Sequence, residues 1–93
     1  KIQSETITQS IKETDLKSWV IQVGSFSQKQ NAQDFRNKLR KNNFTAYVDS
    51  ITNSKGTALF RLRVGPEIDK QRALKAKQQL ESLYKVKTML VSE

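Results

Sequence analysis

Polar side chains alternate with apolar ones in two stretches of the chain that are typical of β-strands. Gln22 interrupts the apolar stretch 19–26, and Arg61 and Arg63 interrupt the stretch 57–64. Successive residues of a strand point to opposite faces of a sheet, so these three side chains should share a face opposite the core. A carboxamide and two guanidinium groups on one face can hydrogen-bond to hydroxyl, amide and carboxylate groups of a ligand.

The composition argues against catalysis. The chain contains no His and no Cys, which excludes imidazole catalysis, thiolate metal sites and disulfide bonds. A glycosidase needs paired carboxylates, and the expected open face offers only Asp49. We therefore expect a binding module rather than an enzyme, with no metal and no cofactor. The net charge of +8 favours a polyanionic partner such as a nucleic acid, an acidic glycan or an anionic membrane surface.

The apolar periodicity predicts six elements that would position these side chains. The expected strands cover residues 19–25, 44–51, 57–64 and 86–91, and the expected helices cover residues 28–41 and 70–84. Ser27 with Gln30 forms a possible capping box for the first helix, and Asp69 is the expected N-cap of the second. The polar cluster 52–56 predicts a turn between two antiparallel strands, and Gly65-Pro66 should end the third strand.

Further residues are expected on the open face by the same alternation. Tyr47 and Asp49 alternate with core residues of the second strand, and Leu59 precedes Arg61 by two positions on the third. In the last strand Lys87 and Met89 should point outward. Tyr47 or Leu59 would provide a flat apolar surface beside the polar groups.

The two halves of the chain repeat each other at a constant offset of 41 residues. Ala32 corresponds to Ala73, Leu39 to Leu80, and the tripeptide that begins at Val23 to the one that begins at Val64. Two β-α-β units predict an α+β fold: a ferredoxin-like (RNP-like) βαββαβ sandwich with a four-stranded antiparallel sheet and two helices on one face. The first and third strands would be central, which would make Gln22 and Arg61 neighbours.

The chain divides into a polar segment and one domain. Residues 1–17 are polar with sparse apolar positions, and we expect a flexible linker or a marginal helix there. The domain should cover residues 18–92. The sequence starts at Lys1 rather than Met, so we interpret it as a fragment whose parent protein could have a signal or membrane anchor elsewhere.

Two short motifs resemble the SPOR domain (sporulation-related repeat). They are Ile21-Gln22-Val23-Gly24-Ser25-Phe26, followed by a helix, and Arg61-Leu62-Arg63-Val64-Gly65-Pro66. The resemblance covers residues 17–92. It implies non-catalytic binding of bacterial septal peptidoglycan, with a preference for glycan strands denuded of stem peptides. It also implies a periplasmic or cell-envelope location at the division septum, with other division proteins as further candidate partners.

The resemblance also implies that the glycan site lies on the open sheet face. By motif position it includes Gln22, Ser25 and Arg61, whereas the aromatic that the family often has two residues before this Arg is replaced by Leu59. Gly24 would let a ligand approach the backbone, and Arg63 would be a second cation for a carboxylate. The full set of expected glycan-binding residues is Gln22, Gly24, Ser25, Tyr47, Leu59, Arg61, Arg63 and Met89.

Two other interpretations remain open at this point. An RNA-recognition motif has the same element order, but it places aromatic residues for base stacking where this chain has Gln22 and Arg61. Nucleic acid is therefore not the expected partner. A ferredoxin-like domain can also use its open face for protein contact or dimerisation. Each polar residue named above has the alternative of being a solvated residue of an ordinary amphipathic strand.

Overall fold

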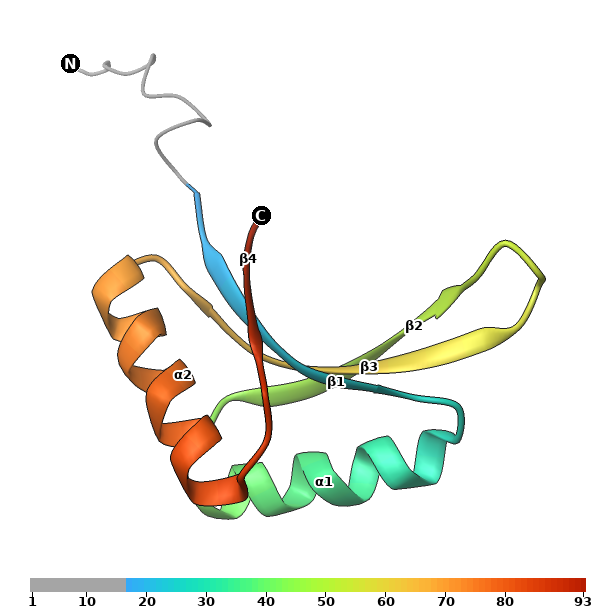
Figure 1. Cartoon of the computed structure of the whole chain (residues 1–93), viewed down its shortest axis with the longest axis horizontal. Coiled ribbons are helices and arrows are strands. Elements are labelled where there is room, and N and C mark those ends of the chain that lie inside the picture. Colours follow the sequence, from blue (N-terminus) through green and yellow to red (C-terminus); the bar gives the residue numbers. More distant parts are fainter. Residues whose placement is uncertain (1–16) are drawn as a thin grey trace, which may run out of the picture.

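Strands and helices follow one another in the expected order (Figure 1). The structure is a computed structural model that describes residues 17–93. Its elements are β1 (Trp19–Phe26), α1 (Lys29–Lys41), β2 (Ala46–Thr52), β3 (Ala58–Glu67), α2 (Lys70–Tyr84) and β4 (Met89–Ser92). Apart from Lys17, the expected linker or marginal helix lies outside the described residues.

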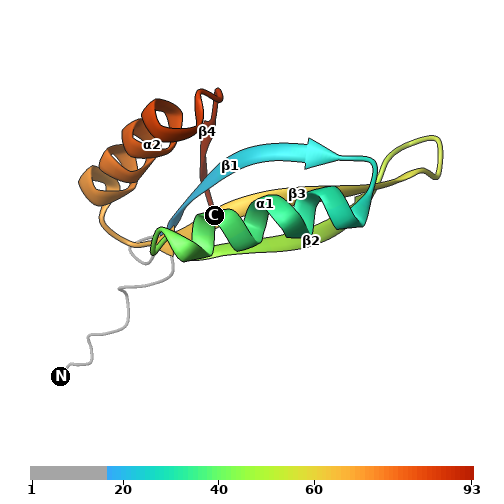
Figure 2. The ribbon, with the colours of Figure 1, turned by 90° about the horizontal axis from the view of Figure 1, so that it is seen from below.

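The four strands form one antiparallel sheet in the order β2-β3-β1-β4. The expected central position of the first and third strands is thus confirmed. Both helices lie on the same side of the sheet, and α1 passes in front of β2 and β3 when the molecule is seen from below (Figure 2). This arrangement is the ferredoxin-like α+β fold, and α1 and α2 leave the same sheet face uncovered among residues 17–93 (Figure 1). Neither helix within residues 17–93 is long and apolar enough to cross a membrane.

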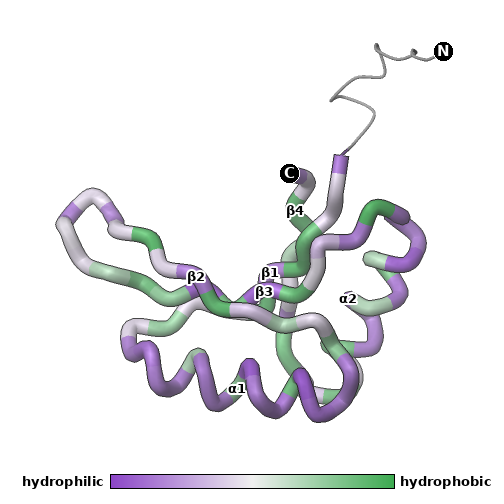
Figure 3. Tube along the Cα trace, turned by 180° about the vertical axis from the view of Figure 1, so that it is seen from behind, coloured by the Kyte–Doolittle hydropathy of each residue, from purple (hydrophilic) through white to green (hydrophobic). Residues whose placement is uncertain are grey.

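The core lies between the sheet and the two helices. Its buried members are Ile21, Val23, Leu39, Ala46, Leu62, Val64 and Leu80. Each helix buries one Ala and one Leu at positions related by the offset of 41, namely Ala32 with Leu39 and Ala73 with Leu80. A small residue lets the helix approach the sheet closely, and the Leu about two turns later on the same helix face fills the space between them. Most of α1 is hydrophilic, as expected for a helix with a single buried face (Figure 3).

Only one of the two expected helix caps is present. Asp69 caps α2, because its side chain accepts a hydrogen bond of 2.9 Å from the backbone N–H of Gln71. The predicted capping box of Ser27 and Gln30 is wrong. Helix α1 begins at Lys29, so Gln28 occupies the N-cap position, and its side chain makes no capping bond. Ser27 is therefore one residue too early to reach the first free amides of the helix.

Strand β3 does not end at Gly65-Pro66, contrary to the expectation. It continues to Glu67, which pairs with Trp19 of β1, although the pairing is irregular between Trp19 and Ile21. Gly65 has a φ of 132°, and a Cβ there would lie 3.0 Å from the carbonyl oxygen of Trp19. Glycine is therefore required by both the backbone conformation and the close approach of β1.

A second irregularity lies in β1 between Gln22 and Gly24. Gln22 pairs with Arg63, but Gly24 pairs with Leu62, so Val23 is an extra residue on the β1 side. This β-bulge shifts the alternation that follows by one residue. The consequence is that Ser25, rather than Gly24, shares a face with Gln22. The prediction that Gln22 and Arg61 are direct neighbours is also wrong, because Gln22 pairs with Arg63 and Arg61 pairs with Ser25.

Candidate functional site

Seven of the eight expected site residues lie on the face of the sheet that the helices leave uncovered, and they form rows across the strands. One row contains Met89 of β4, Gln22 of β1, Arg63 of β3 and Tyr47 of β2, joined by direct strand pairing. The row crosses three strand spacings, or roughly 15 Å. We call it the first row.

A second row lies beside the first, about two residues along β3. It contains Ser25 of β1, Arg61 of β3 and Asp49 of β2. Beyond it Leu59 pairs with Ile51 in the part of the β2–β3 hairpin that extends past the end of β1 (Figure 1). The bulge at Val23 brings Ser25 into this row, because regular alternation would have turned it toward the helices.

Gly24 is the expected site residue that does not lie on this face. It pairs with the fully buried Leu62, and a Cβ added to it would lie 3.5 Å from the ring of Phe26, which packs against the core. The expectation that Gly24 lies on the open face is therefore wrong, and the bulge is the reason. Val20 is two residues before Gln22 on β1 and pairs with Val91, but it is 1 % exposed and offers a ligand no surface.

The guanidinium of Arg61 is held by the carboxylate of Asp49. Its Nε donates to one carboxylate oxygen at 2.8 Å and its NH2 to the other at 2.7 Å. The two hydrogen bonds from Arg61 lower the pKa of Asp49, so this carboxylate remains ionised well into acidic conditions. Among residues 17–93, the N–H groups of NH1 and one of NH2 have no hydrogen-bond partner, since a guanidinium has five N–H donors and Asp49 accepts from two of them.

Arg63 has a different environment, because its side chain is almost completely buried. Only 6 % of the residue is exposed. Its NH1 donates to Glu93 at 2.6 Å and its NH2 to Oε1 of Gln22 at 3.3 Å, while its Nε has no partner within residues 17–93. The expected role of Arg63 as a second cation for a ligand does not fit this burial. Instead Arg63 connects the sheet to Glu93 and orients the carboxamide of Gln22.

The structure adds a shallow hollow of about 210 Å³ at the β4 end of the first row. It is lined by Gln22, Val23, Gly24, Lys87, Thr88 and Met89. Gly24 therefore borders the hollow, although its strand pairing is on the core side. It forms where β4 stops pairing with β1, because the pairing ends at Gln22 and Met89. Lys87 was expected to point outward but was not counted among the site residues. Lys87 lies two residues before Met89 and so shares its face of the expected strand, and this spacing was the signal in the sequence for counting Lys87 among the site residues.

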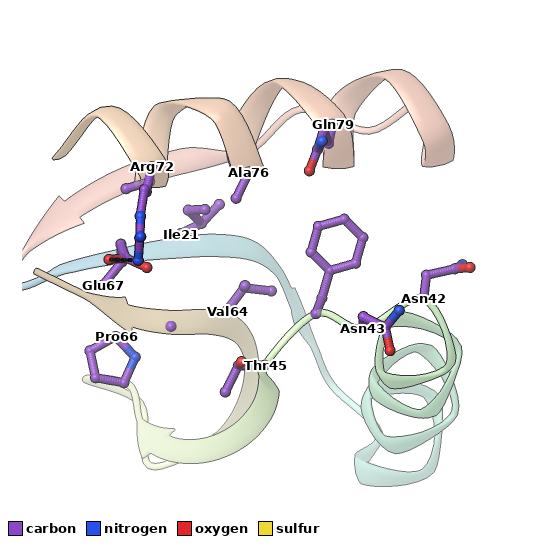
Figure 4. Close-up of a pocket in the computed structure, with 13 residues that line it drawn as sticks. Ile21, Asn42, Asn43, Thr45, Val64, Pro66, Glu67, Arg72, Ala76 and Gln79 are labelled. Carbon is purple, nitrogen blue, oxygen red and sulfur yellow. Dashed lines mark ion pairs between the residues drawn. The ribbon is translucent and has the colours of Figure 1, made fainter. Parts of the chain in front are cut away.

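A larger pocket of about 320 Å³ lies on the helical side of the sheet (Figure 4). Arg72 extends from α2 toward Glu67, 4.0 Å away, and Gln79 points from the same helix toward the pocket. Apolar residues such as Ile21 and Val64 line it, and Asn43 and Thr45 also contribute. None of the expected site residues lines this pocket, so it is a separate feature of the molecule.

The polar groups of the open face include both carboxylates and arginines. Its carboxylates, Asp49 and Glu93, are each bonded to an arginine of the same face. Within residues 17–93 no group of three or more acidic, His or Cys side chains could hold a metal ion. The fold and this face together define a ferredoxin-like domain with a polar sheet surface suited to binding.

Comparisons with known proteins agree with this description. A family model described as SPOR domain matches residues 15–89. The crystal structure of the RlpA SPOR domain from Pseudomonas aeruginosa is similar, with a TM-score of 0.70, 20 % identity, and coverage of 78 % of this chain and 96 % of that one. A structure titled Spor protein DedD has a TM-score of 0.59 and 22 % identity, covering 82 % of this chain and 39 % of that one. A comparison with curated protein sequences gives no match.

The chain belongs to the SPOR domain family, because the family model matches most of its length. It is therefore a peptidoglycan-binding domain of the kind found in division-related envelope proteins, and SPOR domains are binding modules rather than enzymes. The two structural neighbours support the fold.

Proposed function

We propose that the open sheet face binds septal peptidoglycan and prefers glycan strands denuded of their stem peptides. The domain would thereby direct its parent protein to the division septum, in the periplasm or cell envelope. The observation that supports this proposal most is the pair of rows across the sheet. They place hydroxyl, carboxamide, guanidinium and aromatic groups on one surface, and a bare sugar chain can contact such a surface without obstruction by peptide.

The residues proposed to contact the glycan have roles that fit their environments. Gln22 and Ser25 offer hydrogen bonds to hydroxyl and N-acetyl groups. The Gln22 oxygen accepts from Arg63, and within the described part of the chain its NH2 group has no partner. Arg61 donates through the N–H groups that Asp49 does not use. Tyr47 provides a flat surface for a sugar ring, and Leu59 and Met89 extend the apolar contact at opposite ends of the face.

The RNA interpretation receives little support from the geometry. Among residues 17–93, Tyr47 is the one aromatic that the strand pairing places on the open face. Phe60 pairs with Phe26 on the helical side of the sheet. The ring of Trp19 faces the helical side too, because Lys70, the first residue of α2, lies 5.1 Å from its centroid. Base stacking by RNA-recognition motifs needs two or three aromatics on the sheet surface.

The proposal is tested by sedimentation of the 93-residue chain with purified peptidoglycan sacculi, before and after an amidase removes the stem peptides. We expect stronger binding to the stripped sacculi. Arg61→Ala should weaken that binding about tenfold, the effect of losing a charge-assisted hydrogen bond. Gln22→Ala and Ser25→Ala should each weaken it several-fold, since neutral hydrogen bonds contribute about 1 kcal/mol.

The matched control is Gln79→Ala, which makes the same change in the pocket on the helical side. Circular dichroism checks that every variant is folded, and Ser25→Ala removes only an exposed hydroxyl. Equal binding to intact and stripped sacculi would contradict the preference for denuded strands. If Gln79→Ala weakened binding while Gln22→Ala and Ser25→Ala did not, the ligand would occupy the helical pocket instead.

A further inference from the structure

The arginines of the open face are already neutralised by carboxylates of the same chain. Asp49 bonds both Nε and NH2 of Arg61, and Glu93 lies 2.6 Å from NH1 of Arg63. A ligand carboxylate placed against Arg61 would approach Asp49, and the repulsion between the two anions would offset much of the attraction. Arg63 is too buried to reach a ligand. The carboxylate of a ligand therefore needs another cation.

Lys87 is placed to be that cation. It is exposed and lines the hollow at the β4 end of the first row, together with Gln22 and Met89. Within residues 17–93 no carboxylate lies within ion-pair distance of its ammonium group, although Arg61, Arg63 and Lys77 all have such partners. A cation without an internal partner beside an available carboxamide donor is suited to a carboxylate that arrives with the ligand.

The backbone that bears Lys87 is anchored to α2 by its next residue. Thr88 donates to Oε2 of Glu81 through its backbone N–H at 3.0 Å and through its hydroxyl at 2.9 Å. Lys77 donates to the same oxygen at 3.0 Å. These three donors hold the segment between α2 and β4 against the helix. The Lys87 side chain is therefore presented at the hollow from an ordered backbone position.

We infer that Lys87 binds the lactyl carboxylate that removal of a stem peptide leaves on the glycan strand. This inference rests on the proposed function and names the group that distinguishes a stripped strand from an intact one. In an intact strand the lactyl carbonyl is part of an amide bond to the stem peptide. The anionic carboxylate that Lys87 would bind therefore exists only after the peptide has been removed. Gln22 would hydrogen-bond to the same sugar from within the first row.

The experiment pairs a change in the protein with a change in the ligand. Stripped sacculi are used either untreated or with their carboxylates converted to neutral amides by a carbodiimide and glycinamide. Wild-type protein should bind the amidated sacculi about fivefold more weakly, as expected for one exposed ion pair of about 1 kcal/mol. Lys87→Ala should show the same loss on untreated sacculi and no further loss on amidated ones, and Lys87→Arg should retain binding.

Lys75→Ala is the matched control, because Lys75 is an exposed lysine of α2 outside the hollow. If Lys87→Ala bound untreated sacculi as tightly as Lys75→Ala does, the inference would be overturned and the proposed function would remain intact. An equal loss for Lys87→Ala on both ligands would overturn it too, because the side chain would then not act through the carboxylate. If wild-type protein showed no preference for stripped over intact sacculi, the proposed function itself would fail.

Discussion

Two arginines that stand two positions apart in the sequence have different environments in the folded chain. Arg61 is partly exposed and bonded to Asp49, whereas Arg63 is almost fully buried and bonded to Glu93 and Gln22. Their alternation with core residues is the same, so the difference arises from what lies around them. Glu93 reaches Arg63 because the β1–β4 ladder continues to Ser18 and Glu93, which exchange backbone hydrogen bonds of 3.1 and 2.9 Å.

At the residue scale we predict that Glu93→Ala destabilises the fold. The variant leaves the buried guanidinium of Arg63 with Gln22 as its one side-chain partner among the described residues. A hydrogen bond to a charged group typically contributes 1.5–3 kcal/mol, and because Glu93 is half-exposed we expect a loss of about 1.5 kcal/mol. Urea unfolding measures this change. Arg72→Ala is the control, since its guanidinium is largely exposed and its 4.0 Å ion pair with Glu67 should contribute less than about 0.5 kcal/mol. Equal effects of the two variants would contradict the structural role of Arg63.

At the scale of elements, irregularities in strand pairing place the site residues. The bulge at Val23 turns Ser25 to the open face and Gly24 to the core, and the irregular pairing at Gly65 lets β3 continue beyond the expected end. The short β4 depends on another contact, because the segment before it is fixed to α2 by Glu81. The bonds from Thr88 and Lys77 lower the pKa of Glu81 from its usual 4.5 to about 2.

This shift predicts how stability depends on pH. A carboxyl group with a lowered folded-state pKa stabilises the fold fully above its unfolded pKa and loses that contribution as the pH falls through the folded value. The contribution of Glu81 should therefore be complete above about pH 4.5 and disappear toward pH 2. In Glu81→Gln the unfolding midpoint, measured thermally from pH 7 to pH 2, should fall less steeply within this window. Thr88→Val, which removes the hydroxyl donor, should show an intermediate slope. Identical slopes in all three proteins would show that Glu81 is not the group responsible.

At the scale of the whole molecule, the two faces of the sheet have different charge. The residues of α1 include five cations and one carboxylate, Lys29, Arg36, Lys38, Arg40 and Lys41 against Asp34. On the open face both arginines are paired with carboxylates. The excess positive charge of α1 therefore lies on the helical side, where we propose that it attracts anionic envelope polymers in general, while the proposed glycan site lies on the more neutral face.

All four strands of the sheet lie within residues 19–92, and from this we predict where the folding unit begins. A chain of residues 17–93 should unfold within about 4 °C of the full chain, less than the shift that 1 kcal/mol produces in a domain of this size. A chain of residues 20–93 lacks the bonds between Ser18 and Glu93 and the contact of Trp19 with Lys70, and its midpoint should fall by at least that amount. Differential scanning calorimetry distinguishes these cases. A large loss in the first truncation would move the domain boundary toward the N-terminus.

The sequence by itself was enough to predict the element order, the antiparallel sheet with β1 and β3 at its centre, and the shared face of Gln22, Tyr47, Arg61 and Met89. Periodicity determines the elements and the shared face, because a strand has two faces and a helix of this length buries one. The repeated β-α-β unit predicts the strand order. The tertiary structure decided the pairing register, and with it the neighbours of each polar group. A bulge moves a side chain to the other face without changing the local apolar pattern, so Gly24 and Ser25 could not be assigned from alternation. The partners of the arginines were also beyond the sequence, since Asp49 and Glu93 reach them across strands that only the folded sheet brings together.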